Sequence, residues 1–84
     1  MTFFNYIIYS IAVDRFYIGH TENLENRLYR HNNSGSRYTK TTNDWELKWK
    51  MAFGTRSEAM AMERKIKRKK SRGYIESLVK EGEV

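Results

Sequence analysis

The sequence contains no cysteine and only two histidines, His20 and His31. The absence of cysteine excludes a disulfide framework and a thiolate metal site, and it suits a reducing compartment such as the cytoplasm. Two histidines are too few for a zinc cage. The composition therefore favours a cytoplasmic protein without a zinc centre.

The chain also lacks a proline-rich linker, an internal repeat and a low-complexity tract. Its N-terminal segment from Phe3 to Val13 is apolar, but it has neither a basic leader nor a small-residue cleavage site, and polar residues such as Asn5 and Ser10 interrupt it. We expect this segment to form a strand of a soluble protein. The 84 residues suffice for one domain with a modest core, so we expect a single domain over 1–84 with its site in an open groove.

The charges that are present are mostly positive. There are 16 lysines and arginines against 10 aspartates and glutamates, which gives a formal net charge of +6. Such a balance favours a polyanionic partner, either a nucleic acid or an anionic membrane surface. Charge alone does not choose between them.

Two strands are expected at the N-terminus. Residues 4–10 are apolar on both alternating faces, which predicts a central strand, and residues 15–20 form a second β-rich run after a four-residue hairpin loop. In that register Ser10 lies opposite Arg15 and Tyr17 lies opposite Ile8. Tyr6 and Tyr17 then share one face of the sheet.

The rest of the chain predicts three helices and one more strand. Asn23 is the expected N-cap of a helix to about residue 32, followed by a long polar loop, and residues 45–53 alternate as a strand with its apolar side chains on one face. Ser57 is the expected cap of a helix to about residue 70, and a short helix follows Gly73. The order β-β-α-β-α-α predicts an α/β (α+β) fold with a three-stranded sheet flanked by helices.

Glu63 is the anomaly of the second long helix, because it falls on the apolar side, about 40° from Ala59. A carboxylate there must be paired, protonated or bound to metal. One interpretation is an ion pair with Lys67, four residues later. Tyr6 and Tyr17 can likewise be packing aromatics, and Arg27 and His31, about 40° apart on their helix, can be a solvated helix edge.

Five positions in order resemble the GIY-YIG endonuclease domain. They are Tyr6, the run Phe16-Tyr17-Ile18-Gly19, Arg27, His31 and the helical Glu63, with Gly35-Ser36-Arg37-Tyr38-Thr39 and Ser57-Glu58-Ala59 between them. The resemblance covers nearly the whole chain and is closest to small stand-alone bacterial members. Phe4 and Asn5 depart from the first motif, and no asparagine follows Asn43, where many members carry one in the last helical region. Ser71 or Ser77 stands in its place.

The resemblance implies a DNA endonuclease that hydrolyses phosphodiester bonds with one divalent cation, Mg²⁺ or Mn²⁺. The implied roles are Tyr6 as general base, Tyr17 as its partner in placing water, Arg27 as the clamp on phosphate, His31 as a proton-handling group and Glu63 as the metal ligand. Arg37, Lys65 and Lys67 are candidate contacts to the nucleic-acid backbone. Hairpin register and helix phase predict that the five site residues point at the same sheet face.

Two other functions are open at this point. A non-catalytic nucleic-acid-binding module would use the same charge and fold, but it would have no use for a carboxylate facing DNA. A peripheral membrane protein is disfavoured, because the basic helix lacks bulky aromatic residues on its apolar face. One active centre cuts one strand at a time, so we expect a monomer or a weak dimer.

Overall fold

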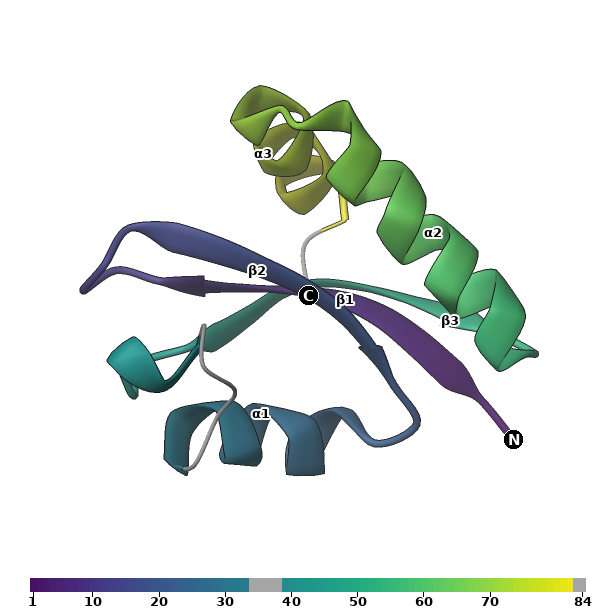
Figure 1. Ribbon diagram of the computed structural model, residues 1–84, viewed down its shortest axis with the longest axis horizontal. Coiled ribbons are helices and arrows are strands. Elements are labelled where there is room, and N and C mark those ends of the chain that lie inside the picture. Colours follow the sequence, from purple (N-terminus) through teal and green to yellow (C-terminus); the bar gives the residue numbers. More distant parts are fainter. Residues whose placement is uncertain (34–38, 83–84) are drawn as a thin grey trace.

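The structure is a computed structural model that describes residues 1–33 and 39–82. The chain runs β-β-α-β-α-α with one added 3₁₀ turn, so the predicted order is confirmed. The elements are β1 (Phe3–Ser10), β2 (Arg15–Thr21), α1 (Leu24–Asn33), η1 (Thr39–Thr41), β3 (Glu46–Phe53), α2 (Arg56–Lys69) and α3 (Arg72–Glu81). Helix α1 covers one face of the sheet, and α2 and α3 cover the other (Figure 1).

The three strands form one antiparallel sheet in the order β2-β1-β3, so β1 is the central strand, as predicted. The β1–β2 register also agrees with the prediction, since Ser10 pairs with Arg15 and Ile8 pairs with Tyr17. Tyr6 pairs with Gly19. Because side chains alternate between faces, Tyr6 and Tyr17 both lie on the α1 side.

The prediction that all the apolar side chains of β3 share one face is wrong. The pairing of β1 with β3 shifts between Ile7 and Ile8, which lie opposite Trp49 and Leu47, so Lys48 is the extra residue of a β-bulge. The bulge reverses the alternation. Trp49 packs with Ile7 under α2 and α3, whereas Leu47 packs with Ile8 under α1.

Each face of the sheet has its own apolar cluster. The α2 and α3 side centres on Ile7, Ile18, Trp49 and Ile66, and the apolar stripe of α3 packs against it. The α1 side is smaller and centres on Tyr6, Ile8 and Trp45. The ring of Tyr6, the candidate general base, is therefore part of the core.

The helix starts follow local capping chemistry. Asn23 caps α1 as predicted, because its Oδ1 accepts a hydrogen bond from the Asn26 backbone N–H at 3.0 Å. The cap of α2 is Thr55 and not Ser57: Thr55 is extended and its hydroxyl accepts from the Glu58 N–H at 3.2 Å. A threonine followed three residues later by a glutamate is a capping box, and it starts the helix two residues earlier than predicted.

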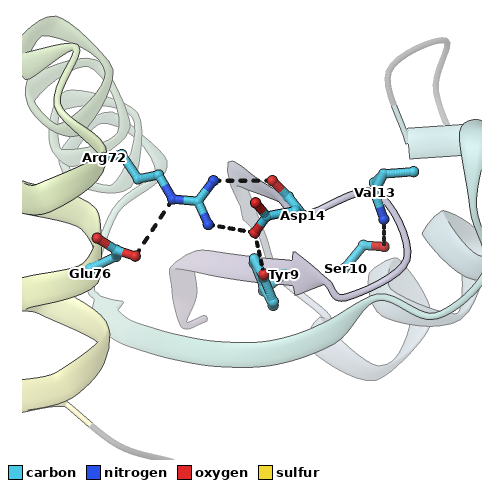
Figure 2. Close-up of polar contacts among 6 residues, drawn as sticks. All are labelled: Tyr9, Ser10, Val13, Asp14, Arg72 and Glu76. Carbon is cyan, nitrogen blue, oxygen red and sulfur yellow. Dashed lines mark hydrogen bonds and ion pairs between the residues drawn. The ribbon is translucent and has the colours of Figure 1, made fainter.

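The β1–β2 hairpin is fixed to α3 by an ionic contact (Figure 2). Arg72 donates to the Asp14 carboxylate at 2.6 Å and to the Asp14 carbonyl at 3.1 Å, and it also reaches Glu76 at 3.5 Å. The Tyr9 hydroxyl donates to the same Asp14 carboxylate. Asp14 adopts a left-handed conformation with φ 53°, which aspartate tolerates in turns. None of the helices described is both long and apolar enough to cross a membrane.

Candidate functional site

A buried chain of hydrogen bonds joins β1, α1 and the 3₁₀ turn. The Tyr6 hydroxyl lies 2.8 Å from Nε2 of His31, and Nδ1 of His31 lies 2.9 Å from the Thr39 hydroxyl. Tyr6 and His31 are 2% and 4% exposed, and Thr39 is fully buried. A neutral imidazole donates through one nitrogen and accepts through the other, so both of its nitrogens are satisfied by hydroxyl partners.

Burial keeps His31 neutral. Burial first, and then the charges of Arg27 and Arg30, lower the pKa of His31 from 6.5 to about 4. The same burial, with the nearby Tyr17 and Glu63, raises the pKa of the Tyr6 phenol, although Arg27 acts in the opposite direction. At neutral pH the pair is therefore a phenol beside an uncharged imidazole.

Gly19 lets the Tyr6 ring lie flat on strand β2. A Cβ atom at position 19 would lie 2.6 Å from the Tyr6 hydroxyl oxygen and 2.8 Å from Cζ, closer than real contacts allow. The Asn5 side chain donates to the Gly19 carbonyl at 2.9 Å from the other face. The glycine of the Tyr17-Ile18-Gly19 run is thus required by the position of the Tyr6 phenol.

Tyr17 extends the site toward the free edge of the sheet. Its ring centroid lies 6.4 Å from that of Tyr6 and 4.9 Å from that of His31, which it meets edge-on. Tyr17 is half-buried on β2, the edge strand. Arg27 lies on α1 beside Tyr6 and lines a polar hollow at the start of that helix.

Glu63 comes from the other layer. It lies on α2, and its oxygens accept hydrogen bonds from Nδ1 of His20 at 2.6 Å and Nζ of Lys67 at 2.7 Å. Burial by itself would raise the pKa of Glu63, but the bonds from His20 and Lys67 outweigh it and the pKa lies below its ordinary value. The carboxylate is ionised, and its side chain is 18% exposed.

The expectation that all five side chains point at the same sheet face is wrong for Glu63. Periodicity placed it on the buried side of its helix, but it could not tell which face of the sheet that helix covers. Lys67 is the link between the layers, because its ammonium lies 2.7 Å from Glu63 and 6.0 Å from the Tyr17 ring centroid. The structure thus gathers Tyr6, Tyr17, Arg27 and His31 on the α1 side, with Glu63 reaching the β2 edge from the α2 side.

The candidate nucleic-acid contacts differ in position. Lys67 lies at the site, as described. Lys65 is exposed, and helix phase puts it about 160° around α2 from Lys67, so its contact with nucleic acid stays a prediction. Arg37 lies outside the described residues. The Ser71 hydroxyl caps α3 by accepting from the Tyr74 N–H, and Ser77 is exposed on α3.

The donor set at Glu63 fits a hydrated Mg²⁺ or Mn²⁺ ion. Within the part of the chain that is described, no three His, Cys, Asp or Glu residues cluster as metal ligands, which excludes an all-protein cage there. Mg²⁺ keeps several waters and commonly uses one or two carboxylates together with substrate phosphates. One ionised, partly exposed carboxylate meets that need, provided that the flexible Lys67 side chain moves aside.

Sequence reasoning missed three residues of this site. His20 binds Glu63, Thr39 completes the hydrogen bonding of His31, and Asn5 fixes the Gly19 carbonyl. Asn5 gave a usable signal, since a buried amide inside a strand needs a partner. Glu63 lies 43 residues after His20, and His31 is separated from Thr39 by a polar loop, so no local pattern identifies either pair.

Comparisons with known proteins show a matching family and several similar bacterial proteins. Residues 3–75 match the GIY-YIG catalytic domain. A UPF0213 protein of Bacillus licheniformis is 39% identical over 70 residues, which are 79% of this chain and 72% of that protein. A UPF0213 protein of Bacillus subtilis is 41% identical over 64 residues, covering 71% of this chain and 65% of that protein.

A solved structure shares the fold. The solution NMR structure of a UPF0213 protein from Bacillus halodurans aligns with a TM-score of 0.59 at 30% sequence identity. The alignment covers 95% of this chain and 84% of that one. This chain, with its β-β-α-β-α-α arrangement, and that UPF0213 protein therefore share one fold.

Proposed function

Because the chain belongs to the GIY-YIG catalytic domain family, we propose that it is a divalent-metal-dependent endonuclease that hydrolyses DNA phosphodiester bonds. The observation that carries the proposal is the hydrogen bond between Tyr6 and a neutral, buried His31. Packing alone does not require a hydroxyl there, and proton transfer does. We place the enzyme in the cytoplasm, acting as a monomer or a weak dimer.

The tyrosine and the histidine act together as the base. A phenol whose pKa is raised by burial cannot lose its proton to solvent at neutral pH. It can pass that proton to Nε2 of His31 as it takes one from the attacking water, so the imidazole carries the net charge. A phosphate near Arg27 and Arg30 offsets two of the charges that lower the pKa of His31, and so makes it a better base.

Arg27 and Tyr17 hold the reacting groups. The Arg27 guanidinium binds the scissile phosphate and stabilises the charge that grows on its oxygens. Tyr17 lies against both Tyr6 and His31 and positions the attacking water at the Tyr6 hydroxyl. The water oxygen bonds to phosphorus, and the bond from phosphorus to the leaving sugar oxygen breaks.

Glu63 is the residue proposed to hold the divalent cation, with water and phosphate as its other ligands. When bound, the ion would offset charge on the phosphate and on the leaving oxygen. His20 orients the carboxylate through its 2.6 Å contact. Lys67 neutralises the carboxylate in the absence of a cation and is free to turn to a phosphate when one is present.

One observation favours the alternative, a nucleic-acid-binding module without turnover. Both oxygens of Glu63 already have partners, His20 on one and the Lys67 ammonium on the other, as in a purely structural contact. In that case the carboxylate needs no metal, and the basic surface alone accounts for nucleic-acid binding.

The test is cleavage of single-stranded, duplex, flapped and branched DNA by the purified protein with Mg²⁺, Mn²⁺ or EDTA. The enzyme should cut only with metal, and Glu63→Gln should abolish cutting while DNA binding persists or tightens, because a negative charge near phosphate is lost. Glu46→Gln is the matched control, since Glu46 pairs with Lys48 on the far edge strand. A wild-type protein that binds these substrates but cleaves none of them would support the binding module instead.

A further inference from the structure

Helix α2 and strand β2 lie side by side and run in opposite directions (Figure 1). Arg56 at the start of α2 donates to Glu22, just beyond the end of β2, at 2.7 Å. Glu63, at the middle of α2, meets His20 near the end of β2, and Lys70 and Arg15 line one hollow at the far end. Seven strand residues and fourteen helix residues each span about 20 Å, so the two elements match in length.

The hollow at the first end is strongly basic. It has a volume of about 260 Å³ and lies between the first turns of α1 and the start of α2. Three guanidiniums line it, from Arg27, Arg30 and Arg56, against the single carboxylate of Glu22. Arg56 is held in place by Glu22 and by the Phe3 ring 5.1 Å away. Arg30 makes no hydrogen bond or ion pair within the described residues.

The hollow at the second end is larger, about 380 Å³, and is also basic. Arg72 lines it but is already neutralised by Asp14 and Glu76 (Figure 2). Arg15, Lys67 and Lys70 also line it, and of these Lys67 is paired with Glu63.

Lys70 carries a conformational cost that packing does not explain. It ends α2 in the left-handed conformation, with φ 48° and ψ 37°, where glycine is the usual residue. A residue with a Cβ atom is strained in that region. Its ammonium has no ion pair or hydrogen bond in the part of the chain that the structure describes. A lysine kept at a position that favours glycine points to a use for its charge.

We propose that a nucleic-acid strand lies along the β2 edge, with one phosphate in each of these two hollows and the scissile phosphate between them. The central position rests on the proposed nuclease function, whereas the two end sites rest only on the placement of charge. At 3.4 Å per nucleotide, about 20 Å corresponds to about six nucleotides of one strand. The chemistry recognised is the phosphodiester backbone, which DNA and RNA share.

The experiment measures metal-free binding of 20-base-pair DNA and RNA duplexes of one sequence by fluorescence anisotropy in EDTA, from 50 to 200 mM salt. Lys70→Gly and Arg30→Gln should each lower the slope of log affinity against log salt by about 0.9, the value for one lost phosphate contact. The affinity lost over that salt range is then about 3.5-fold smaller for each variant. Lys50→Gln removes the same charge from exposed β3, at the other sheet edge, and should leave the slope unchanged.

Lys70→Gly also separates binding from folding. Because glycine relieves the left-handed backbone, the variant should melt at or above the wild-type temperature although it binds more weakly. Salt-dependent binding of either duplex with these slopes supports the two end sites. Equal slopes for Lys70→Gly and Lys50→Gln, or no binding of either duplex, overturn them. If the variants lower the salt slope as expected but the wild-type protein cleaves no DNA, only the proposed nuclease function is overturned.

Discussion

Gly19→Ala tests how strictly the site depends on contact between Tyr6 and strand β2. The added methyl would start 2.6 Å from the Tyr6 hydroxyl oxygen, at the end of a ring packed in the core. Gly19 has no positive φ, so the backbone itself accepts alanine. The whole effect must therefore come from displacement of the phenol away from β2 and from Nε2 of His31.

The expected magnitude follows from two costs and one gain. Forcing an extra methyl into a packed site costs about 1 to 3 kcal/mol, and losing the hydrogen bond to His31 costs about 1 kcal/mol. Alanine in a strand recovers about 0.5 to 1 kcal/mol relative to glycine. We expect a net loss of about 1 to 3.5 kcal/mol in the free energy of unfolding, which lowers the melting temperature by at least about 4 °C in a domain of this size. Denaturant titration and thermal melting measure both.

Gly54→Ala is the matched control, because a Cβ at position 54 meets only the Glu58 carboxylate, at 3.9 Å. It should leave stability and cleavage near wild type. If Gly19→Ala melts like Gly54→Ala and cuts DNA at the wild-type rate, the contact between Tyr6 and β2 does not hold the site in place.

Further predictions concern the base and the carboxylate. The pKa of His31 is about 4 in the folded protein against 6.5 in the unfolded chain, so the unfolded chain gains protons first as pH falls. Stability should drop by up to about 1.4 kcal/mol per pH unit between pH 6.5 and 4, and urea melts of His31→Gln should lack that dependence. Tyr6→Phe should cost about 1 kcal/mol of stability but at least 100-fold in cleavage rate, measured on any substrate that the wild type cuts. Lys67→Gln should tighten Mn²⁺ binding at Glu63 by about 2-fold more than the control Lys65→Gln does, because an exposed helical pair is worth about 0.5 kcal/mol. Electron paramagnetic resonance without DNA measures the Mn²⁺ affinity. Equal effects of the two substitutions would show that Lys67 does not compete with the metal.

Local rules predicted the hairpin and the face that the tyrosines share. A four-residue loop between Ser10 and Arg15 fixes the pairing, and alternation then puts Tyr6 and Tyr17 on one side. The phase of α1 predicted that Arg27 and His31 border its core side. These features depend on residues that are close together in the chain, so pattern was sufficient.

Features set by distant parts of the chain could not be predicted in this way. The bulge at Lys48 is invisible in the alternation of β3, because every second residue from Trp45 to Phe53 is apolar whichever face it meets. Periodicity also gives the buried side of α2 but not the face of the sheet that it covers. The position of Glu63 in the opposite layer follows from that choice of face.

The two layers give the site two environments that one layer could not provide. Tyr6 and His31 need exclusion from water to keep the imidazole neutral, and they lie between α1 and the sheet with at most 4% exposure. A hydrated cation needs a carboxylate within reach of solvent, and the Glu63 side chain is 18% exposed on the other side. Strand β2 carries both, because Tyr17 faces α1 while His20 faces α2. A phosphate that is to touch Arg27 and a cation on Glu63 together must therefore lie at the free edge of β2, where the two environments meet.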